Sequence, residues 1–89
     1  MPFISVSRLD PTTYEVEVIS DSTTHHKVTL ELAYYQKLAG GKEDEERLIE
    51  ASFEFLLERE PNTSILGEFD LSVIPRYFPE YEAEIMHLL

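Results

Sequence analysis

The spacing of apolar residues changes once along this chain, close to residue 30, and this change constrains the fold more than any other feature. Residues 13–20 (TYEVEVIS) and 24–30 (THHKVTL) alternate between apolar and polar positions, and residues 3–9 (FISVSRL) mix β-branched with small polar groups. Such segments predict β-strands. Beyond them, apolar residues recur at helical spacing in residues 31–39 and 44–60. Strands followed by helices indicate an α+β domain.

The connections between the expected strands are short and carry turn residues. The first is DPT, residues 10–12, and the second is DST, residues 21–23. Pro presets one backbone torsion and Asp can bond the nearby backbone, so both segments favour tight turns. We therefore predict an N-terminal three-stranded antiparallel meander followed by three or four helices. With 89 residues, the chain has the length of a single α+β domain, residues 1–89.

The segment 44–60 is the clearest helix in the sequence. Asp44 is a candidate N-cap, acidic residues follow it, and Pro61 ends the helix. Its polar residues form one narrow strip, so we expect sheet on one side of this helix and helices or a second subunit on the other. The apolar side comprises Leu48, Ile49, Ala51, Ser52, Phe53, Phe55, Leu56 and Leu57.

The other expected helices are bounded by Gly, Asp and Pro. The helix 31–39 should end at Gly40, which tolerates the left-handed C-cap conformation. Asp70 is expected to cap a turn through the following residues LSVI. Pro79 is expected to be the first residue of a last helix, 79–88.

The charge of the chain is strongly negative and uneven. The net charge is −11, and residues 43–89 hold thirteen of the eighteen acidic groups but three of the seven basic ones. This field repels nucleic acids and anionic lipids, and it favours a basic protein partner. We therefore expect a protein partner, with nucleic acid disfavoured. The simpler interpretation of this charge is that acidic groups keep a small domain soluble.

Composition excludes several further classes. The chain has no Cys, which excludes disulfides, a thiolate nucleophile and a cysteine zinc site. No apolar run reaches the roughly 20 residues of a membrane span. The start, MPFISVSRLD, lacks the features of a signal peptide, so the expected compartment is the cytoplasm.

No set of residues has the spacing of a known catalytic or metal site. Glu50, Glu54 and Glu58 repeat every four residues and could bind a cation or act as acid and base, but no His accompanies them at the Glu-x-x-His spacing. A solvated face is the simpler interpretation. Adjacent His25 and His26 should point to opposite faces of a strand. The GGK segment, residues 40–42, lacks the rest of a phosphate loop. We expect no catalytic residue, no metal and no cofactor.

Residues 24–60 resemble a ribbon-helix-helix module. The match consists of a strand (THHKVTL), a helix (ELAYYQKLA), a Gly turn and a second helix (EERLIEASFEFLL). The resemblance implies a transcription regulator or antitoxin that dimerises through pairing of this strand between subunits. It also implies that the outward strand residues His25, Lys27 and Thr29 contact bases.

Residues 53–82 resemble a second group, a family of small, uncharacterised bacterial proteins that share a SIL…FDLSVI.RYFPEY segment. The resemblance implies a bacterial cytoplasmic origin and no known activity.

Our leading functional hypothesis is a non-enzymatic protein–protein interaction module that uses its acidic, aromatic C-terminal half. Aromatic residues and Arg are common anchors of interfaces. Leu88 and Leu89 at the C-terminus lead us to expect a homodimer. The predicted partner surface consists of Phe69, Arg76, Tyr77, Phe78 and Tyr81. The simpler interpretation of this aromatic segment is that it packs over the central helix, with Arg76 paired to an acidic residue.

Overall fold

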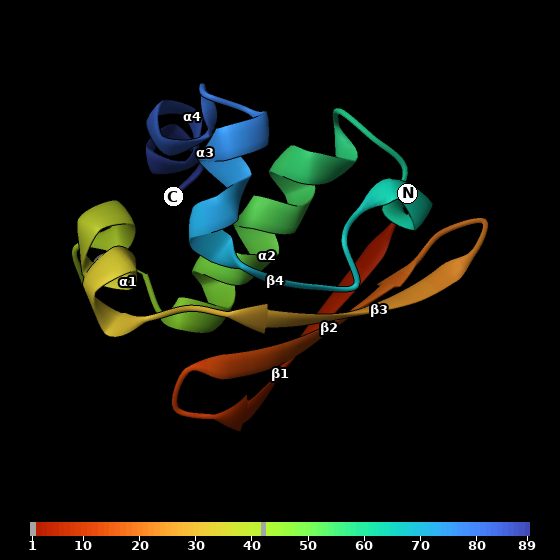
Figure 1. Ribbon diagram of the computed structural model, residues 1–89, viewed down its shortest axis with the longest axis horizontal. Helices are drawn as coiled ribbons and strands as arrows, with labels where there is room; N and C mark the ends of the chain where they lie inside the picture. Colours follow the sequence, from red (N-terminus) through yellow and green to blue (C-terminus); the bar gives the residue numbers. More distant parts are fainter. Residues whose placement is uncertain (1, 42) are drawn as a thin grey trace.

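The computed structural model describes residues 2–41 and 43–89 as one sheet with helices packed on one of its faces (Figure 1). Met1 and Lys42 lie outside the described residues, and so does the end of the GGK segment that was compared with a phosphate loop. The elements are β1 (Phe3–Asp10), β2 (Thr13–Ile19), β3 (Thr23–Thr29), α1 (Leu32–Ala39), α2 (Glu45–Leu57), β4 (Glu68–Asp70), α3 (Ile74–Tyr77) and α4 (Tyr81–Leu88), with 3₁₀ turns η1 (Asn62–Ser64) and η2 (Leu71–Val73).

The predicted antiparallel meander is confirmed, but the sheet is larger than predicted. Strands β1, β2 and β3 pair antiparallel in chain order, and β4 adds parallel to β3. The N–H of Lys27 donates to the C=O of Gly67 at 2.8 Å, beside this pairing. The sheet is therefore mixed and four-stranded. A strand of three residues is too short to show a period of two, which explains why the sequence did not reveal it.

The two faces of the sheet differ as the alternation predicted. Tyr14, Val16 and Val18 of β2 are fully buried against the helices. Glu15 on the same strand is exposed on the other face. The helices therefore cover one face of the sheet, and the other face meets solvent.

Helix α2 lies between the sheet and the C-terminal helices, as predicted for a helix with a wide apolar surface (Figure 1). On the sheet side, the ring of Phe53 lies 5.3 Å from that of His26. On the other side, the ring of Phe55 packs edge-on against Tyr81 of α4, at 5.2 Å. Asp44 caps the helix by accepting a hydrogen bond from the N–H of Arg47 at 2.7 Å.

Helix α2 ends earlier than predicted. The sequence predicted a helix to residue 60, whereas the last helical residue is Leu57. The N–H groups of Arg59 and Glu60 both donate to the C=O of Leu56, each at 2.9 Å. This shared acceptor tightens the last turn and ends the regular helix before Pro61 is reached.

Two of the predicted boundaries are confirmed and one is wrong. Gly40 adopts the left-handed conformation, with φ of 57°, and ends α1. Asp70 caps η2 by accepting from the N–H of Ser72 at 2.9 Å. Pro79 does not begin the last helix. It lies in a turn in which the N–H of Tyr81 donates to the C=O of Phe78 at 2.9 Å, and α4 begins at Tyr81.

In the part of the chain that the structure describes, no helix has the length and the apolar character needed to cross a membrane.

Candidate functional site

A half-open apolar groove of about 280 Å³ lies between the end of α2, the segment from η1 to β4, and the segment from η2 to α3. Two side chains on its rim are strongly exposed, Leu66 at 48% and Tyr77 at 66%. Because large apolar side chains with such exposure are free to contact another molecule, this groove is a candidate binding site. Its lining comprises Leu56, Glu60, Ser64, Ile65, Leu66, Phe69, Val73, Ile74, Tyr77 and Phe78.

Local structure explains how these residues come together. Phe69 pairs with Val28 in the parallel β3–β4 ladder, and both side chains point to the helical face of the sheet. The ring of Phe69 lies 6.0 Å from that of Phe53. Ile74 of α3 and Phe78, which directly follows α3, also line the groove. Strand β4 and the segment of α3 therefore both contribute side chains to it.

Among the described residues that line this groove, Glu60 is the one carboxylate. Burial raises the pKa of the Glu60 carboxyl above its usual value, because the apolar wall disfavours its charged form. Within the described ranges, its side chain has neither an ion-pair partner nor a hydrogen-bond donor in the protein. A partly desolvated carboxylate of this kind gains stability when a cation or a donor from another molecule reaches it.

Neighbouring carboxylates at the start of α4 and on its first turn are paired within the chain. The side chain of Arg59 lies over the ring of Phe55 and binds Glu80, at 3.2 Å, and Glu84. The N–H of Glu80 itself, together with Arg59, holds the pKa of Glu80 below its usual value. Arg59 therefore joins the end of α2 to α4, and no ion pair links it to Glu60 in the part of the chain that the structure describes.

Glu82 of α4 has partners of the same kind on α1. It accepts hydrogen bonds from the hydroxyl of Tyr34 at 2.8 Å and from Lys37 at 3.3 Å. These donors lower the pKa of Glu82, with Tyr34 as the larger cause. Glu82 consequently joins α1 to α4, and its carboxylate is already paired with residues of this chain.

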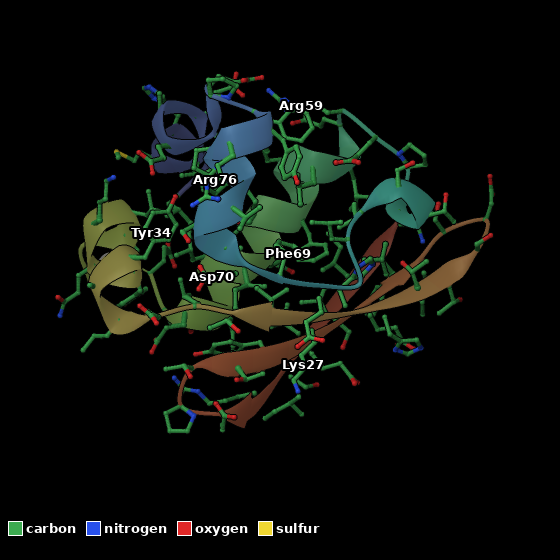
Figure 2. All side chains as sticks on the ribbon, in the orientation of Figure 1. Lys27, Tyr34, Arg59, Phe69, Asp70 and Arg76 are labelled. Atoms are coloured by element: carbon green, nitrogen blue, oxygen red, sulfur yellow. The ribbon has the colours of Figure 1, made fainter. Side chains whose placement is uncertain are left out.

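Three of the five predicted surface residues line the groove, namely Phe69, Tyr77 and Phe78. Arg76 is exposed but lies outside the groove, on the side of α3 that faces α1 (Figure 2). The prediction that Tyr81 belongs to the partner surface is wrong. It is fully buried, and its hydroxyl hydrogen-bonds to that of Ser52 at 2.7 Å, so it cannot contribute to a surface.

Sequence reasoning missed Glu60, Ile65 and Leu66. Glu60 stood among thirteen acidic residues of the C-terminal half, with nothing to distinguish it from the solvated ones. Two adjacent apolar residues, Ile65 and Leu66, between a turn and Gly67 were a usable signal, because consecutive apolar residues in a loop must be covered or functional.

The residues implied by the ribbon-helix-helix resemblance lie on the open face of the sheet. The imidazole of His25 is 3.6 Å from the carboxylate of Glu17, and Lys27 pairs in register with Glu15. Acidic neighbours on this face oppose contact with phosphates. Strand β3 also bonds β2 on one edge and β4 on the other. Where β4 covers it, β3 therefore has no free edge that could pair with a second subunit.

The acidic strip on α2 is partly neutralised. Arg47 lies 2.8 Å from Glu50 and 3.3 Å from Glu54. Glu58 is 71% exposed at its side chain and lies 3.8 Å from Arg59. Over residues 2–41 and 43–89, no group of three potential metal ligands comes together.

Comparison of the chain with protein-family models, with curated proteins and with solved structures gives no match. The two resemblances therefore stay predictions.

Proposed function

We propose that this protein is a non-enzymatic interaction module, and that the groove beside α3 docks a segment of a protein partner that presents an apolar side chain next to a Lys or Arg. The observation that carries the proposal is the pairing of an apolar groove with the partly buried, unpaired carboxylate of Glu60. The net charge of −11 favours the approach of such a basic partner.

The residues of the rim suit a protein partner. Tyr77 and Leu66 extend the apolar surface beyond the groove itself, because about half or more of each side chain is exposed. Aromatic side chains at the centre of an interface carry much of its binding energy when the partner excludes water from them. A peptide side chain can fill the groove while its neighbours cover Tyr77 and Leu66.

The proposal is tested by panning a phage-displayed library of short random peptides on the purified protein. Enriched peptides are expected to combine an aromatic or aliphatic residue with an adjacent Lys or Arg. Tyr77→Ala should weaken the best peptide about tenfold or more. Leu32→Ala is the matched control, since Leu32 is a 61% exposed apolar residue on α1, outside the groove. Enrichment of acidic peptides, or equal loss in both variants, would contradict the proposal.

Glu60→Gln separates binding from stability. At neutral pH, the variant should be as stable as the parent protein or more stable, because it removes a desolvated charge, yet it should bind the cationic peptide less tightly. The folded-state pKa of Glu60 lies above its unfolded value, so the folded protein takes up a proton first as pH falls. The stability advantage of the variant should therefore shrink below the folded-state pKa and vanish below the unfolded one.

The measurement is urea denaturation of both proteins at a series of pH values, with peptide titrations at neutral pH. Glu58→Gln is the control, because Glu58 is adjacent in sequence but largely exposed. A Glu60→Gln variant that loses stability at neutral pH would show that the Glu60 carboxylate already has a favourable partner in the folded chain, and the groove would then lack the unpaired charge that the proposal requires.

A further inference from the structure

Strand β1 forms the outer edge of the sheet, opposite β4 (Figure 1). The direction of its backbone groups follows from the neighbouring ladder. The N–H of Leu30 donates to the C=O of Thr12 at 2.8 Å, which makes Thr13 and Thr29 a pair that exchanges no hydrogen bonds. The odd-numbered residues of β2, such as Glu17, must then direct their N–H and C=O groups toward β1.

The same alternation determines which backbone groups of β1 bond β2 and which point outward. Ser5 and Ser7 lie opposite Glu17 and Glu15, so their backbone groups bond β2. The backbone N–H and C=O groups of Ile4, Val6 and Arg8 consequently point away from the sheet. Within the described part of the chain, no segment pairs with this edge. Three donors and three acceptors therefore stand in a row that another strand can use.

The open edge is poorly protected against such pairing. Residues 3–7 carry no charge, and Phe3 is 62% exposed. Ile4 and Val6 are only partly buried against the core. Sheet edges are usually guarded by charged residues, Pro or bulges within the strand. Within β1, Arg8 and the irregularity that follows it interrupt the edge at its far end, and Pro2 stands just before its start.

The surface beside this edge is acidic. A hollow of about 400 Å³ lies next to the start of β1, and its apolar lining comprises Pro2, Phe3, Ile4 and Leu57. Three carboxylates from α2 and its C-cap line it; Arg47 lies against two of them, and Arg59 is 3.8 Å from the third. These carboxylates belong to Glu50, Glu54 and Glu58.

We propose that the β1 edge binds an extended, basic segment of a partner protein as a fifth strand of the sheet. Its main chain pairs with the free N–H and C=O groups of Ile4, Val6 and Arg8. Its side chains alternate in direction, so every second one lies on the helical face, where Lys or Arg residues meet Glu54 and Glu58. A second copy of the chain is the poorer occupant, because it would bring two acidic strips together, each in a protein of net charge −11.

The test uses a capped synthetic peptide of alternating Lys and Val, and measures amide hydrogen exchange in the protein by NMR. The amide protons of Ile4, Val6 and Arg8 are expected to exchange at least about tenfold more slowly with the peptide bound. Those of Ser5 and Ser7, already bonded to β2, should change little. A peptide of alternating Glu and Val is the control for charge and should give no protection.

Two variants locate the binding. Val6→Pro removes a donor from the open edge and leaves the β1–β2 hydrogen bonds in place, so it should weaken the Lys–Val peptide about tenfold. Glu58→Lys changes an exposed side chain, and should weaken the peptide by a similar factor without affecting folding. If Val6→Pro does not fold, Glu58→Lys still carries the test.

Three results would overturn the proposal. The first is peptide binding that leaves the amides of Ile4, Val6 and Arg8 unchanged. The second is equal protection by the Glu–Val peptide. The third is protection of these amides in the free protein that rises with protein concentration, since this would identify a second copy as the occupant.

Discussion

Replacing Phe53 by Ala is expected to lower the free energy of unfolding by about 3–5 kcal/mol. Phe53 is fully buried and lies where α2 meets the sheet, with the rings of His26 at 5.3 Å and Phe69 at 6.0 Å. Its removal leaves a cavity that the surrounding strands cannot close without shifting. Since a small domain is stable by only about 5–15 kcal/mol, much of the protein should unfold at moderate temperature.

Urea denaturation followed by circular dichroism measures this effect. Tyr77→Ala is the control, because it removes an equally large aromatic side chain that is 66% exposed. Its effect on the free energy of unfolding should stay within about 0.5 kcal/mol. A loss of less than about 1.5 kcal/mol for Phe53→Ala would contradict the placement of this ring at the centre of the core.

Replacing Asn62 by Ala is expected to cost about 2–3 kcal/mol. The amide nitrogen of this buried side chain donates to the C=O of Ser22 at 2.9 Å and to the hydroxyl of Thr24 at 3.0 Å. The hydroxyl of Thr24 can in turn donate to Nε2 of His26, at 2.8 Å. The C=O of Leu66 can only accept, so Nδ1 of His26 carries the proton in that 2.8 Å bond.

This chain of hydrogen bonds joins η1 and the rim of the groove to β3. Without Asn62, the C=O of Ser22 and the hydroxyl of Thr24 lose their donor, and the segment that carries Leu66 loses part of its anchorage. Asn62→Ala should therefore weaken binding in the groove as well as stability. Thr63→Ala, at an exposed neighbouring position, is the control for both measurements. Equal stability of the two variants in urea would disprove the role assigned to Asn62.

The sequence predicted those parts of the fold that local physics determines. Alternation in residues 13–20 and the apolar surface of the helix that begins after Asp44 led to the sheet and to its central helix. It did not predict β4, because three residues carry no periodic signal and the pairing with Lys27 spans about forty positions of the chain. The end of α2 was not predicted either, because it depends on two N–H groups that share the C=O of Leu56, and no residue type signals this arrangement.

The same distinction applies to the groove. Phe69, Tyr77 and Phe78 stood out as aromatic residues in a short segment, and they line it. Tyr81 had the same signature, yet it is buried because it begins α4 facing Ser52. Glu60 was not foreseen, since its burial depends on apolar residues that other elements bring to it. A site of this kind depends on tertiary contacts, which residue types in one segment do not encode.

The most direct test of the proposed docking function is a crystal structure of the protein with a peptide enriched by panning. We expect an apolar side chain of the peptide between Phe69 and Tyr77, with a Lys or Arg of the peptide within ion-pair distance of Glu60. A peptide bound elsewhere, or one that fills the groove and leaves Glu60 without a cation or donor, would contradict the proposed docking function.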